Sequence, residues 1–178
     1  MFETDEITIV QVMKAISQFK RTFVSFNSKY DQYLRGEVTL SNEEFRGMTL
    51  FFTEKGDCFH CHGNMFFTTH SFHNNGIQSI ITDIGLEAVT GMSSDMGLFK
   101  TPTLRNTEVS GPYMHGAQFD TLEEVVDHYN SGGHITDTID PLIRELNLTD
   151  EEKEDLVLFL KTLADWTFIE NSNFQNPF

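Results

Sequence analysis

The stretch Cys58-Phe59-His60-Cys61-His62 places two thiols three positions apart and an imidazole directly after the second thiol. This is the C-x-x-C-H signature of covalent haem attachment. On one turn of chain, Cys58 and Cys61 can reach the two vinyl groups of one porphyrin, and His62 supplies the proximal nitrogen to iron. The pattern therefore predicts one covalently attached haem c.

Other readings of a C-x-x-C pair are a disulfide, a thiol redox couple and half of a zinc site. Zinc would need two further ligands, but these are the only two cysteines in the chain. The remaining histidines do not recur at the H-x3-5-H spacing, and His70 and His73 come nearest. A thioredoxin-like couple needs a βαβ context, yet no Val/Ile-rich strand precedes Gly56. Haem is the reading that uses all three residues of the motif.

Length and charge restrict the classes of partner. The 178 residues, of which 39% are hydrophobic, suit one domain or one domain with an arm. The apolar runs are far shorter than the roughly 18 residues that cross a bilayer, so no membrane span is expected. A formal net charge of -15 makes nucleic acid and anionic membrane surfaces poor partners. A basic partner steered by charge fits better, although a merely solvated acidic surface gives the same composition.

The first six residues lack the basic and apolar regions of a secretory signal. Covalent haem attachment is nevertheless expected in an exported compartment. We therefore expect a periplasmic or otherwise exported protein whose leader was removed, or a piece of a longer precursor.

Helical periodicity dominates the ordered parts of the sequence. An amphipathic helix is predicted over residues 6–24, with an apolar face that needs a packing partner. Capping boxes that begin at Ser41, Thr121 and Thr149 predict three more helices. The segment from Gly63 to Thr101 has no sustained period, so it is expected to be a long irregular loop that wraps a haem edge.

Several further segments occur together with the haem motif and resemble one known family. They are Gly47–Phe51, Cys58–Gly63, Phe72–Gly76, Phe99–Asn106, Gly111–Gly116 and Thr121–Val126. The family is that of the bacterial di-haem cytochrome c peroxidases, with relatives that include the tryptophylquinone-forming di-haem enzymes. The chain resembles their C-terminal haem domain, and residues 8–34 resemble the end of the domain that precedes it.

The resemblance implies an all-α fold, with a cytochrome c-like single-haem domain and long irregular haem-wrapping loops. Residues 1–36 would be a helical arm left from a preceding domain, 37–170 the haem domain, and 171–178 a poorly ordered tail in which Phe174 and Phe178 could dock.

Family members carry two haem motifs, with peroxide reacting at the N-terminal haem and electrons entering at the C-terminal one. This sequence carries one motif, so the resemblance implies an electron-transfer domain that alone is a weak or inactive peroxidase. The implied partners are a second haem domain and a small electron carrier of the cytochrome c or cupredoxin type, and a homodimer is also compatible. The alternative is a free-standing mono-haem electron carrier or haem-based binding protein.

The distal iron ligand is expected to be Tyr129, because the helical phase after Thr121 turns it to the apolar side and relatives place a methionine or tyrosine there. A packed core aromatic is the alternative. The other candidate ligands are Met114, His115 and His128, with Met92 and Met96 behind them. The resemblance also places His115 near the haem, and it places a calcium site between the two haem domains at Ser110 and Pro112.

Overall fold

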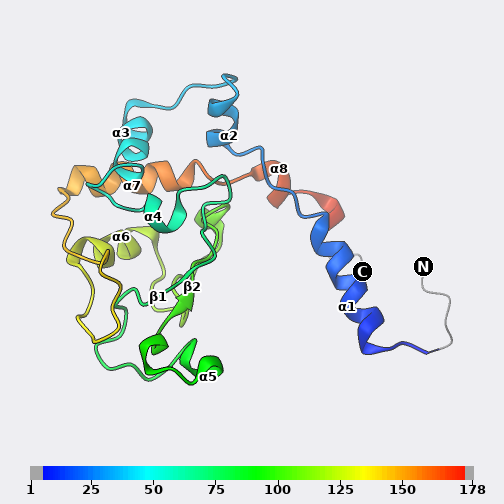
Figure 1. Ribbon diagram of the computed structural model, residues 1–178. Helices are drawn as coiled ribbons and strands as arrows, with labels where there is room; N and C mark the ends of the chain where they lie inside the picture. Colours follow the sequence, from blue (N-terminus) through cyan, green and yellow to red (C-terminus); the bar gives the residue numbers. More distant parts are fainter. Residues whose placement is uncertain (1–5, 175–178) are drawn as a thin grey trace.

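The computed structural model describes residues 6–174, and Figure 1 shows their arrangement. Phe178, which is expected to be able to dock, lies outside the described residues. The prediction of a mostly helical chain is confirmed. In chain order the elements are α1 (Ile9–Arg21), α2 (Lys29–Leu34), α3 (Asn42–Phe51), α4 (Phe59–His62), β1 (Phe72–His73), α5 (Glu87–Thr90), the 3-10 turn η1 (Ser93–Asp95), β2 (Phe99–Lys100), η2 (Thr107–Val109), α6 (Leu122–Ser131), α7 (Asp150–Lys161), α8 (Trp166–Ile169) and η3 (Ser172–Phe174).

Side-chain caps set the starts of the main helices. All three predicted capping boxes form, at the N-termini of α3, α6 and α7. Two more, at Thr8 with Gln11 and at Ser28 with Asp31, start α1 and α2. The first helix is shorter than the predicted 6–24: it begins at Ile9 because the Thr8 side chain accepts from the amide of Gln11, and it ends at Arg21.

The core lies where α3 packs along α7 (Figure 1). The rings of Phe51 and Phe159 are fully buried, with centroids 5.2 Å apart. The two helices approach closely at Gly47, where an added Cβ would lie 1.9 Å from the carbonyl oxygen of Asp155. A glycine is required there for the two backbones to meet. Phe67, from the loop after the haem motif, completes the aromatic cluster.

The segment between residues 63 and 101 is largely irregular, as expected, but it contains one small sheet. β1 and β2 pair antiparallel, with Phe72 opposite Lys100. Nearby, the buried hydroxyl of Thr68 donates to the carbonyl oxygen of Thr101 at 2.7 Å. Two-residue strands carry too little pattern for a sequence to reveal them.

Helix α1 projects from this body, with α8 and η3 beside its end (Figure 1). Its apolar face is exposed in the described chain: Ile9 is 71% exposed, Met13 60% and Ile16 54%. At and just after its C-terminal end, Phe19 and Phe23 make edge contacts with Phe174. Phe174 thus packs against these two rings.

The charged residues of α1 are all cationic, namely Lys14, Lys20 and Arg21, in a chain whose net charge is strongly negative. The segment that follows α1 is joined to the body by Arg105, which bonds to Asp31 in α2. Of the helices in residues 6–174, none combines the length and apolarity needed to cross a membrane.

Candidate haem site

The haem motif lies on the short helix α4, and Cys58 immediately precedes it. The chain enters through Asp57, whose φ of 58° is in the left-handed region. Two contacts hold this turn: the Asp57 carboxylate lies 2.5 Å from Nδ1 of His60 and 3.2 Å from the guanidinium of Arg144. The local backbone is therefore fixed by charged groups just before the first cysteine.

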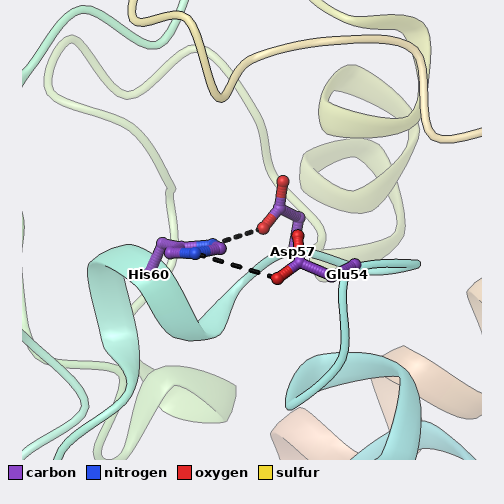
Figure 2. A group of neighbouring side chains, drawn as sticks. All are labelled: Glu54, Asp57 and His60. Carbon is purple, nitrogen blue, oxygen red and sulfur yellow. Dashed lines mark hydrogen bonds and ion pairs between the residues drawn. The ribbon is translucent and has the colours of Figure 1, made fainter.

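Figure 2 shows the ring of His60 facing the carboxylates of Asp57 and Glu54, with the Glu54 carboxylate 4.0 Å from Nε2. The three groups lie close enough together to share a cation. However, Arg144 already neutralises Asp57, and Glu54 is mostly exposed. Because each ring nitrogen of His60 faces a different carboxylate, the cluster is a network of polar contacts that stiffens the turn.

The imidazole of His62 is oriented by one backbone oxygen. Its Nδ1–H donates to the carbonyl of Phe67 at 2.8 Å, which leaves Nε2 available to a metal. Burial lowers the pKa of His62 and nearby His73 adds to this effect, while the hydrogen bond that His62 donates to Phe67 opposes it. A neutral imidazole with a fixed tautomer is the form that ligates iron. Sequence reasoning identified His62 but not Phe67, because a backbone carbonyl leaves no residue-type signal.

Both motif thiols are free. Burial raises the pKa of Cys58 to about 12, and it raises the pKa of Cys61 above its usual value. Reactive C-x-x-C couples need the opposite shift, because the thiolate is the nucleophile in disulfide exchange. The structure therefore disfavours the thiol-couple reading and leaves two thiols that suit thioether bonds to a porphyrin.

Tyr129, on α6, lies close enough to both cysteines for their charges to act on it. Burial raises the pKa of its hydroxyl, a hydrogen bond from Asn75 opposes the rise, and Cys58 and Cys61 add to it. The phenol therefore keeps its proton unless a cation lies beside it, as a bound metal would. Tyr129 is half-buried, whereas Leu122 and Val126 on the same helix are fully buried.

Asn75 links two of the candidate ligands, and sequence reasoning gave it no role. Its Nδ2 lies 3.4 Å from Oη of Tyr129 and 3.3 Å from Sδ of Met114. Its carbonyl oxygen lies 2.9 Å from Nε2 of His128, so that histidine is already engaged. The structure thus brings Tyr129 and Met114 together around one amide.

The remaining candidate ligands lie elsewhere. His115 pairs with Asp83 at 3.2 Å and stacks on Phe99, with its side chain more than half exposed. Within residues 6–174, no hydrogen bond or ion pair joins it to the motif. Met92 is 55% exposed, and the carbonyl of Met96 accepts a hydrogen bond from Thr138.

A histidine outside the predicted set faces the same region. His73 lies 2.6 Å from Oδ2 of Asp140 through Nδ1, and its Nε2 is buried without a hydrogen-bond partner among the described residues. Asp140 also acts electrostatically on Cys61. Because 67 residues separate His73 from Asp140, no local pattern announces the pair.

The residues present fit a c-type haem. They supply two free thiols, a proximal nitrogen with its tautomer set by Phe67, and an oxygen and a sulfur donor at Tyr129 and Met114. The buried, unpaired Nε2 of His73 is a further polar atom open to a ligand.

The two residues expected at a calcium site, Ser110 and Pro112, are both exposed, and the Ser110 hydroxyl donates to the carbonyl of Thr107.

Comparisons with known proteins point to one family. The family model described as di-haem cytochrome c peroxidase matches residues 1–39. The methylamine utilization protein MauG of Methylorubrum extorquens is 36% identical over 85% of this chain and 43% of its own length. Cytochrome c551 peroxidase of Nitrosomonas europaea is also 36% identical, over 92% of this chain and 47% of its own length.

The chain belongs to the di-haem cytochrome c peroxidase family. A solved structure of a MauG-like protein associated with microbial copper homeostasis superposes with a TM-score of 0.91 and 37% identity, covering 98% of this chain and 59% of that one. The di-haem peroxidase BthA of Burkholderia thailandensis superposes with a TM-score of 0.68 and 25% identity, over 81% of this chain and 48% of its own. The chain spans about half the length of these relatives. Membership of the family implies a c-type haem cofactor.

Proposed function

We propose that this chain is the c-type haem electron-transfer domain of a di-haem cytochrome c peroxidase-like protein, with a cytochrome c-like fold, which passes electrons to a peroxide-reducing haem in a second domain. The observation that carries the proposal is the orientation of His62. Its Nδ1 is committed to Phe67, so Nε2 is free beside two unpaired thiols. When bound, the haem supplies the redox centre, and the protein holds it and sets its ligands.

The role of Tyr129 follows from the same geometry. We infer that its oxygen is the distal iron donor, because it lies near both cysteines and receives a hydrogen bond from Asn75. A hard oxygen donor favours ferric over ferrous iron relative to methionine. With His62 and Tyr129 both holding the iron, the haem would have no open position for peroxide and would serve electron transfer.

The exposed apolar face of α1 supports a second haem domain as partner. Ile9, Met13 and Ile16 project from the body, and contiguous apolar surface of this kind marks an interaction site. The family model matches residues 1–39, a range that contains this helix and ends near the proposed boundary at residue 36. We infer that residues 1–36 pack with the second haem domain, and residues 37–170 bind the haem of this chain.

The same proposal includes the remaining partners. We infer a small carrier of the cytochrome c or cupredoxin type as electron donor, an exported location, and a calcium between the haem domains at Ser110 and Pro112. A homodimer is compatible with it. Charge supports a basic face on the carrier, because the chain carries a formal net charge of -15.

Intact mass tests the cofactor directly. The chain matured in a haem-ligating host and then denatured should exceed its polypeptide mass by one haem, and the Cys58→Ala/Cys61→Ala variant should not. An unmodified mass for the parent chain would refute haem attachment.

Peroxide turnover tests whether this chain only transfers electrons while the second haem domain reduces peroxide. With hydrogen peroxide and a reduced carrier, the isolated chain should turn over no faster than free haem. The longer protein with both haems should turn over well. Robust turnover by the isolated chain would instead favour a free-standing mono-haem protein whose iron has an open face.

A further inference from the structure

The side-chain amide of Asn75 has a defined orientation. Its Oδ1 accepts the backbone N–H of Ile77 at 3.3 Å, so the amide nitrogen must point the other way. The Nε2 of His128 donates to the carbonyl oxygen of Asn75 at 2.9 Å, which fixes the backbone. Asn75 is therefore held from both sides before it contacts any candidate ligand.

The amide nitrogen then meets two donors of different chemistry. It lies 3.3 Å from the thioether sulfur of Met114 and 3.4 Å from the phenol oxygen of Tyr129. A primary amide carries two N–H groups, so it can donate to both atoms at once. The backbone of Met114 has a φ of 70°, in the left-handed region that a methionine adopts only when its surroundings impose it.

We propose that Asn75 is a positioning residue that decides which of two donors, Tyr129 or Met114, reaches the haem iron. The inference rests on the proposed haem site, and it adds that Asn75 determines the identity of the distal ligand. One N–H of Asn75 orients the Tyr129 oxygen and stabilises it when it is charged. The other N–H occupies a lone pair of the Met114 sulfur and keeps that softer donor from the metal.

Removal of the amide changes both contacts in the same direction. The Tyr129 oxygen loses its hydrogen-bond donor. The Met114 sulfur loses its donor as well, and it lies next to Tyr129 because both contacted the same amide. A thioether favours ferrous iron more than a phenolate does, so the reduction potential should rise when sulfur gains a share of the iron.

The test compares Asn75→Leu, which has similar volume but no N–H, with the matched control Asn42→Leu at an exposed position of α3. Asn75→Asp is the second variant, because it keeps an acceptor for Ile77 and loses the amide donor. Haem content, the ferric absorption spectrum and the midpoint potential are measured for each protein. The sulfur-to-iron band should appear in both Asn75 variants, with an upward shift in potential in Asn75→Leu, which adds no charge, and the control should match the parent.

Further variants assign the outcome. The band should vanish again in Asn75→Leu/Met114→Leu, which identifies the sulfur. If Tyr129→Phe alters the spectrum while both Asn75 variants keep the parent spectrum and potential, the role of Asn75 is refuted and the haem site stands. If Tyr129→Phe leaves the spectrum unchanged, Tyr129 is not a ligand and the inference fails with it. Absence of covalent haem would instead overturn the proposed function itself.

Discussion

The guanidinium of Arg105 lies 2.9 and 3.0 Å from the two carboxylate oxygens of Asp31, and the two side chains are only 9% and 8% exposed. This bidentate pair joins α2 to the loop that follows β2. Arg105 also donates to the carbonyl oxygens of Ser25 and Met65. One buried cation therefore ties three segments of the chain together.

Replacement of Arg105 by methionine should destabilise the fold strongly. The Asp31 carboxylate would remain buried without its partner, at a cost of about 3 to 5 kcal/mol. The free energy of unfolding from denaturant titration measures this. The control is Lys161→Met, which breaks an exposed pair with Glu123 and should cost less than about 1 kcal/mol. Equal losses in the two variants would contradict the buried-pair interpretation.

The same pair predicts a dependence of stability on pH. Burial alone would raise the pKa of Asp31, but hydrogen bonds from Arg105 and Ser28 outweigh it, and the pKa lies below its usual range. A lowered pKa stabilises the folded state fully above the unfolded carboxyl pKa of about 3.9, and this contribution is lost as pH falls through the folded pKa. The stability gap between the parent and Asp31→Asn should therefore narrow on acidification from pH 7 to pH 3. A gap that stays constant would refute this linkage.

Gly47→Ala tests the close approach of α3 and α7. Alanine is the better helix former by about 1 kcal/mol, so an open site would be stabilised. Here the new Cβ would lie 1.9 Å from the Asp155 carbonyl oxygen and 2.9 Å from Cβ of Phe159, so the helices must separate. We expect a net loss of at least about 1 to 3 kcal/mol by thermal or denaturant unfolding. Thr49→Ala, exposed on the same helix, is the matched control and should change little.

Tyr129→Phe should change the ferric haem spectrum. The iron should become five-coordinate, because the neighbouring donors Met114, His128 and His115 are each engaged by Asn75 or Asp83. A sulfur-to-iron band in the variant would identify Met114. An unchanged spectrum would leave Tyr129 as packing alone.

Serine substitutions on α1 separate folding from docking. Met13→Ser/Ile16→Ser removes apolar surface that is already exposed, so the unfolding free energy of this chain should change by less than about 0.5 kcal/mol. Binding to a separately produced second haem domain should weaken. Gln18→Ser on the same helix is the control and should bind like the parent. Unaltered binding by the double variant would exclude this face as the contact.

The sequence predicts well those features that local chemistry determines. Capping residues at Ser41, Thr121 and Thr149 mark helix starts because each cap lies within three residues of its partner. The haem motif is equally local. Pairs such as His73 with Asp140 join segments 67 residues apart, and only the folded chain reveals them.

Backbone groups are the second class of feature that the sequence does not show. The carbonyl of Phe67 that orients His62 could come from any residue type. The face of α1 is a different case, because periodicity identified its apolar side correctly but could not show that the described chain leaves it uncovered.

Phe67 serves the core and the ligand at the same time. Its ring is 1% exposed and packs against Phe51, while its carbonyl holds His62. Its φ of 52° is unfavourable for a bulky residue, so the surrounding packing must impose it. Melting of the aromatic core and release of the proximal imidazole should therefore be one cooperative event. Because thioether bonds would keep the haem attached after unfolding, its absorption spectrum would report the temperature at which the core melts.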